Sequence, residues 1–541
     1  MKALRYHEQT KHHFNRFARS LGRLDWANQP DPFRRYAGAA LVTLPRLALA
    51  PSVSYDALFE GDVAPVPITL ESIGEFLRCS MGLSAWKQFG SSRWALRVNP
   101  SSGNLHPTET YVVHGGRVCH YAVREHALEE RCVFRDPREG GDAGFLVGLS
   151  SIYWREAWKY GERAFRYCQH DAGHAIGALR FAAALLGWRL ALLPRWGDGQ
   201  IASLLGLDRD DDYRGAEREE AECLAVVTRA DAGALLDEAP SPLARAAAAG
   251  TWTGLANRLS SSTVAWPIIE DVGAATRYPG IGDRGLGIGG IGERRSPIPD
   301  PQSPRDPHSP RARSIVLSRR SALAFDAHSG LRRDAFIAML RRLRPISPPW
   351  DAIHWPPHVH LVLFVHRVEG LVPGIYAYLR DPAAHSEWKD AMRPEFLWER
   401  ITDPTAPNDP NDPNDPNDLF LLVPLDCRRL ANRLSCDQEI AEDGFFSLAM
   451  IARLEAPLRE QGEWFYRRLF WECGLIGQVL YLEAEAVGAR STGIGCFYDD
   501  PVHEALGLTG HAWQSLYHFS MGVPVEDTRL TSEPGYEWES R

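Results

Sequence analysis

The chain has 541 residues, more than one hydrophobic core usually supports, so two domains with connecting segments are expected. A hydrophobic content of 44% suffices for packed cores, and a net charge of −9 without blocks of Lys and Arg argues against nucleic-acid binding. The sequence contains no uninterrupted apolar run of about 18 residues and no apolar segment at its start, which predicts neither a membrane span nor a secretory signal. We therefore expect a cytoplasmic protein that binds neither nucleic acid nor membrane.

The nine cysteines are scattered, form no C-x-x-C pair and are odd in number. This pattern is typical of reduced thiols rather than of a disulfide framework or a zinc site. His12 is followed by His13, and His170 lies four residues before His174, but no third ligand stands near either pair in the sequence. The sequence therefore predicts no metal site.

The predicted elements begin with an N-terminal extension, residues 1–60, which has an amphipathic helical start around Tyr6–Leu21. A first domain follows at residues 61–230. Its strand candidates are rich in β-branched residues, and its best helix candidate has apolar residues at helical spacing. These candidates are the strands 109–115 and 224–229 and the helix 171–186.

A connecting segment, residues 231–313, leads to a second domain at residues 314–541. Residues 279–313 are dense in Gly, Pro, Ser and Arg, which predicts a linker. The repeat NDPNDPNDPND at residues 408–418 predicts an exposed loop with Asx-type turns. The strand candidates of the second domain are residues 358–368, 374–379 and 517–523. Both halves mix helices with strands, which predicts an α+β fold.

Two segments of the chain share one pattern. Residues 161–187, GERAFRYCQHDAGHAIGALRFAAALLG, align with residues 462–488, GEWFYRRLFWECGLIGQVLYLEAEAVG, at a constant shift of 301 residues. The same shift aligns LLGL, which ends at Leu207, with ALGL, which ends at Leu508. A shared spacing of this length predicts two copies of one fold. Two such copies can pair as an intramolecular pseudo-dimer, and each is then free to lose half of a shared site.

The first candidate binding motif is RVNPSSGNLHPTETY, residues 97–111. Pro100 ends regular structure, two hydroxyl side chains follow, and Gly103 lets a ligand approach the backbone. Asn104 adds a side-chain donor and acceptor. The same composition is also typical of an ordinary polar turn.

Two further motifs lie in the second half. SRRSALAF, residues 318–325, combines two fixed positive charges with a hydroxyl, as a phosphate site requires. In ARSTGIGCFYDDP, residues 489–501, Gly493 and Gly495 allow backbone N–H groups to reach a planar ligand. Each motif also has a plainer interpretation, as a solvated basic helix start and as a strand-to-loop turn.

The joint order of these motifs resembles the nitroreductase-like flavoprotein superfamily and, within it, the SagB/ThcOx (McbC-like) dehydrogenases. RVNPSSGNLHPTETY resembles that group's R-x-x-P-S-[AS]-G-x-L-x-P-x-E-x-Y loop, and KYGERAFRY, residues 159–167, resembles its K-Y-G-x-R-x-[FY]-R-[FY] segment. RRSALAF and GIGCFYDDPVHEALGL resemble the group's first-helix phosphate motif and its late G-x-G-x-F loop. The opening YHEQTKHH is similar as well, so the resemblance covers most of the chain.

The resemblance implies FMN at a dimer interface, where one subunit supplies the basic motif and the late glycine loop and the other supplies the Pro-Ser-Ser loop. In this chain the first half keeps PSSGN and KYGER but lacks the basic motif and the glycine loop. The second half keeps RRS and TGIG but lacks PSSGN, and Glu460 and Gln461 stand where the first half has Lys and Tyr. The halves are complementary, so we expect one composite FMN site per chain.

The resemblance also implies roles for individual residues. The two arginines and the serine of the basic motif would bind the phosphate, the glycine loop would lie at the flavin, and the Pro-Ser-Ser loop would close the site. The expected FMN-binding residues are Arg319, Arg320, Ser321, Pro100, Ser101, Ser102, Asn104, Gly493, Ile494, Gly495 and, more weakly, Arg529. Leu323 departs from the family, which has a second basic residue there.

Lys159 and Tyr160 match the Lys-Tyr pair of the azoline-oxidising members. Oxidation of an azoline removes a proton from carbon and transfers a hydride to flavin N5. A base is therefore needed to accept the proton. Lysine serves as a base where burial keeps its amine uncharged, and tyrosine can orient or relay. The plainer interpretation is a surface lysine beside a packed tyrosine.

Together these features predict two tandem nitroreductase-like domains, each a mainly antiparallel sheet flanked by helices, that form an intramolecular pseudo-dimer. The predicted function is FMN-dependent dehydrogenation of an azoline or related C–N bond in a peptide or small-molecule precursor, with biosynthetic partner proteins presenting a peptide substrate. One alternative is an NAD(P)H-dependent reductase of nitro, quinone or ene substrates, which NAD(P)H consumption would reveal. Another is a non-catalytic, degenerate flavin-fold scaffold, which failure to bind flavin would favour.

Overall fold

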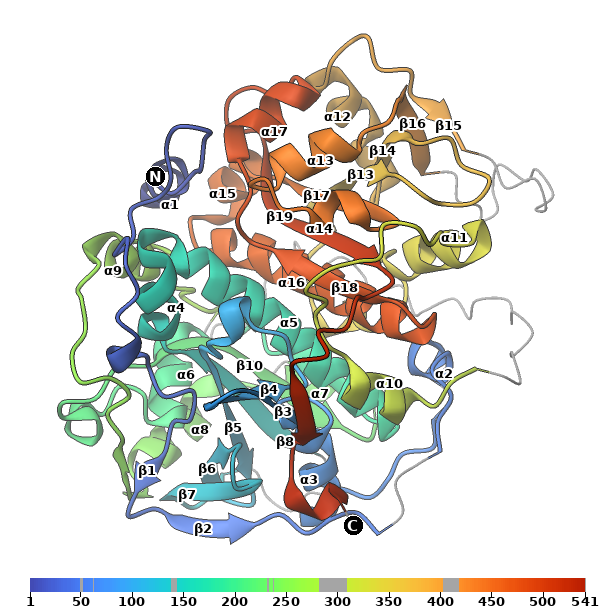
Figure 1. Cartoon of the computed structure of the whole chain (residues 1–541). Coiled ribbons are helices and arrows are strands. Elements are labelled where there is room, and N and C mark those ends of the chain that lie inside the picture. The colour runs from blue at the N-terminus through green and yellow to red at the C-terminus, as the bar shows by residue number, and fades with distance from the viewer. Residues whose placement is uncertain are drawn as a thin grey trace. The chain divides into compact units, whose positions relative to one another are not determined.

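Figure 1 shows the computed structural model of the chain. It describes residues 1–48, 52–61, 63–137, 144–230, 233–236, 238–281, 309–401 and 418–540. Most of the linker expected at residues 279–313, and all but the last residue of the loop expected at 408–418, lie outside these ranges. The chain divides into two compact units. Unit 1 comprises Met1–Ala18, Ser318–Ser347 and Pro356–Thr528, and unit 2 comprises Arg19–Leu317, Pro348–Trp355 and Arg529–Arg541.

Unit 2 is built on an eight-stranded sheet whose neighbouring strands are antiparallel. The order is β11 (Thr251–Trp252), β7 (Ala127–Val133), β6 (Arg117–Ala122), β5 (Thr108–His114), β8 (Phe145–Ser151), β10 (Glu220–Thr228) and β9 (Arg189–Leu192), with β2 (Ala40–Thr43) paired to β7. The predicted strands 109–115 and 224–229 are confirmed as β5 and the second half of β10. Nearly every residue of these two strands is buried, in line with their β-branched, apolar composition.

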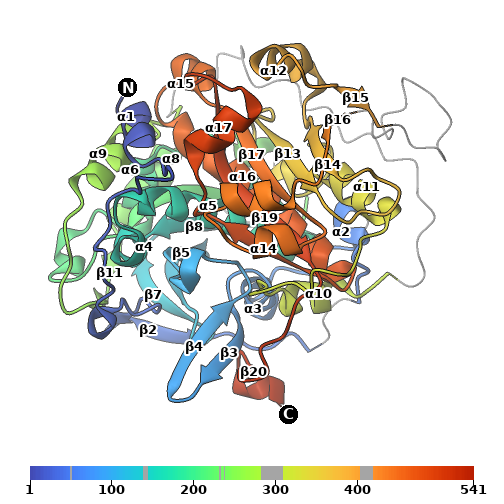
Figure 2. The same ribbon diagram turned by 45° about the horizontal axis from the view of Figure 1, so that its top comes forward.

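Unit 2 also contains helices and two small sheets. The helices are α2 (Ala57–Glu60), α3 (Leu70–Arg78), α4 (Tyr153–Tyr160), α5 (Ala164–Leu185), α6 (Asp198–Leu205), α7 (Gly233–Leu236), α8 (Pro240–Ala248), α9 (Pro267–Ala275) and α10 (Ala312–Ser318). One small sheet joins β20 (Thr531–Pro534) to β3 (Leu83–Phe89) and β4 (Ser92–Arg97), and Figure 2 shows these strands side by side. The other pairs β1 (Tyr36–Ala37) with β12 (Leu255–Ala256). The C-terminal strand therefore belongs to unit 2.

Unit 1 is built on a seven-stranded antiparallel sheet. The order is β15 (Glu399–Arg400), β16 (Leu419–Pro424), β14 (Gly374–Tyr378), β13 (Val359–Val365), β17 (Phe446–Arg453), β19 (Trp513–Gly522) and β18 (Arg490–Ile494). The helices are α1 (Lys2–Gln9), α11 (Arg333–Arg342), α12 (His385–Ala391), α13 (Arg428–Leu434), α14 (Ile440–Asp443), α15 (Glu455–Gln461), α16 (Phe465–Ala486) and α17 (Asp499–Leu506). The predicted strands at 358–368, 374–379 and 517–523 are confirmed as β13, β14 and the C-terminal half of β19.

The two units share one connectivity. The strand order β7-β6-β5-β8-β10-β9 in unit 2 corresponds to β16-β14-β13-β17-β19-β18 in unit 1, taken in chain order within each unit. The helices α5 and α16 each have 22 residues, and their first residues, Ala164 and Phe465, differ by the 301 positions of the sequence repeat. The helices α6 and α17 are related by the same shift. The α+β class and the two sheet-containing halves predicted from the sequence are thus confirmed.

Two predicted helices have different bounds in the structure. Helix α5 begins at Ala164, seven residues before the predicted start. All of its residues are buried, including the polar residues of its first turns. Its first turns therefore lack the apolar stripe by which an amphipathic helix is recognised in a sequence. The helix expected around Tyr6–Leu21 is wrong beyond Gln9, where α1 ends. The chain then turns, because His13 and Arg16 exchange backbone hydrogen bonds at 2.6 and 3.0 Å.

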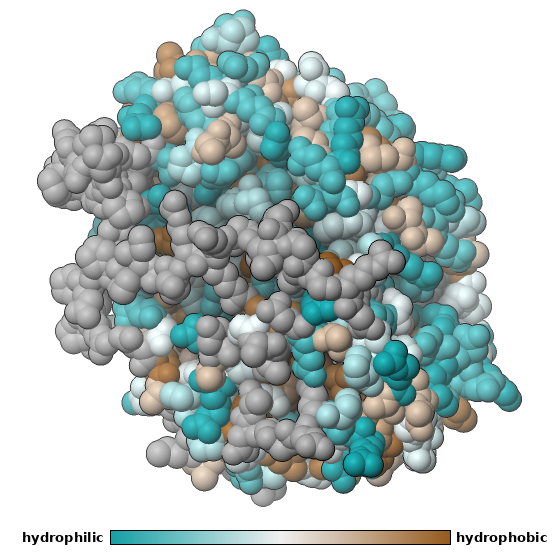
Figure 3. Space-filling model, turned by 180° about the vertical axis from the view of Figure 1, so that it is seen from behind, coloured by the Kyte–Doolittle hydropathy of each residue, from teal (hydrophilic) through white to brown (hydrophobic). Residues whose placement is uncertain are grey.

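Among the described residues, every helix is too short or too polar to cross a bilayer. On the described part of the face drawn in Figure 3, hydrophilic residues predominate and hydrophobic residues are scattered.

Candidate functional site: two motif pairs

In unit 2, the loop of residues 97–111 joins β4 to β5 and contains a short helical turn at Ser102–Asn104. Gly103 and Asn104 both have positive φ, 58° and 60°, a conformation that glycine and asparagine adopt most readily. Asn104 Nδ2 donates to the Ala95 carbonyl oxygen at 2.8 Å, and Ser101 Oγ accepts from the His106 N–H at 2.7 Å. The side chains of Asn104 and Ser101 therefore hold the loop and the end of β4 in place, and Pro100 is buried.

Lys159 and Tyr160 lie against this loop. Both are half-buried at the C-terminal end of α4. A Cβ atom added at Gly103 would stand 2.6 Å from Tyr160 Oη and 3.0 Å from Lys159 Nζ. Lys159 Nζ is 5.2 Å from the centre of the Tyr160 ring, and that ring packs on Tyr167 with centroids 4.3 Å apart. The structure thus brings together the two motifs that the sequence places in the first half.

Two buried carboxyl groups lie near this pair, and sequence reasoning missed both. Asp171 on α5 accepts hydrogen bonds from the N–H and the Oγ of Ser102 at 3.0 Å. Burial raises the pKa of Asp171 to about 7, against the opposing hydrogen bonds from Ser101 and Ser102. The only hint in the sequence is the position of Asp171 within the repeated helix.

Glu156 is the second carboxyl, one helical turn before Lys159 on α4. It is fully buried, and within the described part of the chain neither of its oxygens has a hydrogen-bond partner. Burial raises the pKa of Glu156 well above its ordinary value, and the charge of Asp171 adds to the effect. A raised pKa favours the protonated, uncharged form of this carboxyl group.

In unit 1, the basic motif follows α10 and does not open a helix, in contrast to the basic helix start considered from the sequence. Its segment pairs with the start of the glycine loop: Ser321 and Ser491 form a parallel bridge, and the Ala322 N–H donates to the Ser491 carbonyl oxygen at 3.1 Å. Thr492 Oγ1 donates to the Ala322 carbonyl oxygen at 2.6 Å. The structure therefore brings the two motifs of the second half together as well.

Tyr481 on α16 connects these two motifs, and sequence reasoning missed it. Its hydroxyl lies 2.9 Å from Ser321 Oγ and accepts the Gly493 N–H at 3.0 Å. Its ring lies 5.0 Å from the guanidinium carbon of Arg319. Gly493 also has a packing reason to lack a side chain, because a Cβ atom there would stand 1.9 Å from Tyr517 Oη.

The basic motif fits a phosphate group. Arg319 is buried, and burial lowers its pKa while the nearby Tyr481 and Glu485 oppose the change. Arg320 is half-buried, its N–H donates to Glu485 Oε1 at 3.0 Å, and Ser321 is exposed. A buried guanidinium gains most from an added anion, so this donor set suits the phosphate that the resemblance implies.

The remaining predicted residues are placed as follows. Ile494 is buried at the end of β18, and Gly495 is half-buried in the next position. Arg529 belongs to unit 2, where its guanidinium carbon lies 5.5 Å from the centre of the Phe89 ring. Leu323, the departure from the family pattern, is exposed.

Comparison with known proteins points to one fold. Residues 316–523, which contain most of unit 1, match the Nitroreductase family. A crystal structure from Anabaena variabilis ATCC 29413, of a protein assigned as a nitroreductase, is similar over 97% of this chain and 99% of its own, with 21% identity and a TM-score of 0.65. No curated protein matches the chain.

Two other solved structures resemble only part of the chain. A protein from Ralstonia eutropha JMP134, also assigned as a nitroreductase, covers 36% of this chain and 95% of its own, with 16% identity and a TM-score of 0.26. The Escherichia coli microcin synthetase McbBCD complex with truncated pro-MccB17 covers 35% of this chain and 71% of the matched chain, with 18% identity and a TM-score of 0.25. The full-length similarity shows that the whole chain has a nitroreductase-like fold, and residues 316–523 match the Nitroreductase family.

Proposed function

We propose that this protein is an FMN-dependent dehydrogenase of the SagB/ThcOx type, which oxidises an azoline or a related C–N bond in a peptide or small-molecule precursor. The observation that carries the proposal is the contact of Lys159 and Tyr160 with Gly103 of the loop at residues 97–111. This loop and this pair are the features that resemble the azoline-oxidising group. A peptide substrate would be presented by a partner protein.

We attribute the shared connectivity of the two units to a tandem duplication, with one composite FMN site per chain. Arg319, Arg320 and Ser321 would hold the phosphate, with Arg529 as a further candidate, and Ile494 and Gly495 would lie at the flavin. The loop with Pro100, Ser101, Ser102 and Asn104 would close the site from the other half. The complementarity of the motifs supports this division, because each half carries what the other lacks.

Bound FMN would supply a hydride acceptor. The residues of this chain would handle the proton that leaves carbon when an azoline becomes an azole. Lys159 is the proposed base, and Tyr160 is the proposed orienting group, because their polar ends meet beside Gly103. Asp171 would position the loop through Ser102, and Glu156 would lie one helical turn from the base.

The first test is the amount of FMN released per chain, followed by oxidation of a thiazoline peptide by the loaded protein in air. One FMN per chain and formation of a thiazole would support the proposal, and Lys159→Ala should lower kcat by at least about 100-fold with FMN retained. Lys87→Ala, a half-buried lysine of β3, is the matched control. Two FMN per chain would refute the composite site, and none after reconstitution would favour the scaffold.

A reductase is the second candidate, favoured by the match of residues 316–523 to the Nitroreductase family. It predicts steady NAD(P)H consumption with a nitro, quinone or ene substrate. A protein that binds FMN, leaves the thiazoline unchanged and consumes NAD(P)H in this way would be assigned to this function instead.

A further inference from the structure

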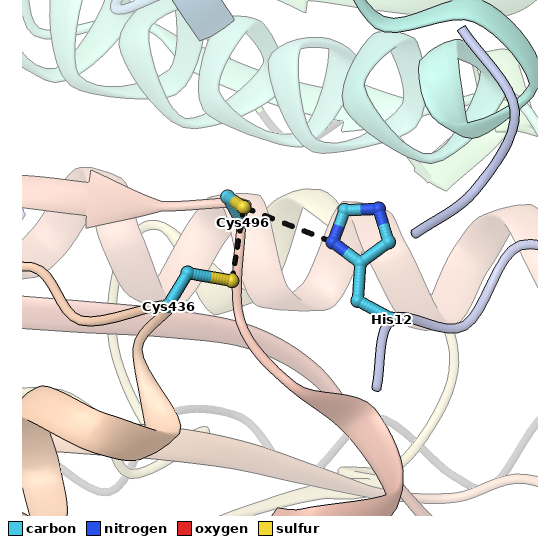
Figure 4. Close-up of side chains that lie close together, drawn as sticks. All are labelled: His12, Cys436 and Cys496. Atoms are coloured by element: carbon cyan, nitrogen blue, oxygen red, sulfur yellow. Dashed lines mark hydrogen bonds between the residues drawn. The ribbon is translucent and has the colours of Figure 1, made fainter. Parts of the chain in front are cut away.

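Three potential metal ligands from distant parts of the sequence meet within unit 1. They are His12, Cys436 and Cys496, and one ligand atom from each lies within 4.8 Å of the others. Cys496 Sγ lies 3.7 Å from His12 Nδ1 and 3.0 Å from Cys436 Sγ. Figure 4 shows the two sulfur atoms and one ring nitrogen turned toward one another.

The backbone around this cluster is held in place by other contacts. The His12 N–H donates to Asp499 Oδ2 at 2.8 Å, and the Asp499 N–H donates back to the His12 carbonyl oxygen at 3.0 Å. Lys11 extends the contact through an ion pair with Asp500 at 3.0 Å. The N-terminal segment is therefore fastened to the start of α17 independently of any metal.

The two cysteine segments are also tied to each other. Gln438 Nε2 donates to the carbonyl oxygens of Ser435, at 2.7 Å, and Cys496, at 2.9 Å. Cys436 and Asp437 both adopt positive φ, 57° and 56°, which is unfavourable for residues with a side chain. This turn presents the Cys436 thiol to Cys496.

We propose that His12, Cys436 and Cys496 form a zinc site, with the fourth position taken by water. Two thiolates and one imidazole are the donor set that zinc prefers over harder cations. With Zn–S near 2.3 Å and Zn–N near 2.0 Å, a tetrahedral ion separates nitrogen from sulfur by about 3.5 Å and the two sulfurs by about 3.8 Å. The observed 3.7 Å between nitrogen and sulfur fits, and the sulfurs need to part by less than about 1 Å.

The three proposed ligands are largely shielded from solvent but remain partly accessible to an ion. His12 is 7% exposed, and both cysteines are half-buried, so an ion can enter without unfolding the unit. Asp437, next to Cys436, is engaged by Arg433 at 2.7 Å and is not proposed as the fourth ligand. Because Cys496 directly follows Gly495, the ion would restrain the glycine loop after β18 and join it to the N-terminal segment.

The test is zinc content and zinc affinity of the full chain, expressed without a polyhistidine tag and kept reduced. We expect one zinc per chain, and we expect Cys436→Ser, Cys496→Ser and His12→Gln each to lower the affinity, measured against a chromophoric chelator, by more than about 100-fold. His13→Gln is the matched control, because His13 is the next residue and is absent from the cluster. Zinc binding that survives all three substitutions, or is lost equally in His13→Gln, overturns the proposal.

Cobalt gives a second measurement that does not depend on variants. Co²⁺ added to the wild-type protein should produce a thiolate charge-transfer band and the strong visible bands of tetrahedral coordination. A reduced protein that binds neither Zn²⁺ nor Co²⁺ overturns the site. A protein isolated with a Cys436–Cys496 disulfide that takes up no Zn²⁺ once a thiol reductant has opened the disulfide overturns it as well. FMN content is measured on the same samples, so this result is separate from that of the proposed function.

Discussion

Gly103 lies directly against Tyr160, so closely that a Cβ atom at Gly103 would stand 2.6 Å from the tyrosine hydroxyl. The same atom would stand 3.0 Å from Lys159 Nζ. One small residue thus allows the loop at residues 97–111 to meet the end of α4. It is at this contact that the two motifs of the first half become one structural feature.

Gly103→Ala should therefore disturb more than the backbone. Alanine at φ 58° is strained by about 1 kcal/mol, and the contact with Tyr160 adds a steric term that displaces Tyr160 and Lys159. We expect the free energy of unfolding, measured with urea, to fall by about 2 kcal/mol in total. Gly115→Ala is the control, because Gly115 has φ 57° and open space around its Cβ position. Equal losses in the two variants would show that Tyr160 does not constrain Gly103.

The raised pKa of Asp171 predicts that the stability of the protein depends on pH between 3.8 and about 7. Its pKa rises from 3.8 to about 7 on folding, so between these values the folded state binds a proton that the unfolded state has lost. Stability from this group is then highest below pH 4 and falls as the pH rises to 7, with a slope of at most about 1.4 kcal/mol per pH unit. Asp171→Asn keeps an acceptor for Ser102 and removes this dependence, so the stability of the wild type relative to the variant should fall between pH 4 and 7. Parallel profiles for the two proteins would contradict the raised pKa.

The raised pKa of His120 predicts a second pH dependence of the stability, between pH 6.5 and about pH 9. It lies in the core of unit 2 between two carboxylates, with Nδ1 2.9 Å from Glu129 Oε2 and Nε2 3.0 Å from Glu109 Oε2. Burial opposes the charge, but the hydrogen bonds to both carboxylates prevail and raise the pKa of His120 from 6.5 to about 9. The contribution of a raised histidine is fully present below pH 6.5 and is lost as the pH rises through 9.

His120→Gln should therefore be less stable than the wild type by about 2 kcal/mol or more at pH 6, and this difference should shrink toward pH 9. Chemical denaturation at several pH values measures it. His13→Gln, which replaces a half-buried histidine of unit 1, is the control for the loss of a histidine as such. A constant difference between His120→Gln and the wild type would mean that His120 is neutral in the folded protein.

The proposed composite FMN site predicts that substitutions in opposite halves remove the same cofactor. Arg320→Ala and Ser102→Trp should each lower FMN affinity by at least about 100-fold, the first by loss of a charge-assisted contact and the second by filling the site. Equilibrium dialysis with FMN measures this, with Arg428→Ala and Ser92→Trp as controls at exposed positions. Retention of half of the bound FMN by each variant would mean that each half has a site of its own.

The sequence by itself determined the elements whose signal is local. The β-branched and apolar residues of β5, β13 and β14 predict strands, and the structure buries nearly all of the residues in these strands. The shift of 301 residues predicts the matching helices α5 and α16, because a repeated spacing reflects a repeated connectivity. The division of the candidate binding motifs between the halves can likewise be read from the sequence.

Only the tertiary structure decided which distant side chains meet. Asp171 and Tyr481 are polar residues on buried helices, and their partners, Ser102 and Ser321, lie far away in the chain, so no spacing reveals them. His12 and Cys496 are 484 positions apart, and a search for neighbouring ligands therefore predicts no metal site. Local patterns follow from backbone periodicity, whereas a site depends on how the folded backbone brings separate segments within hydrogen-bonding distance.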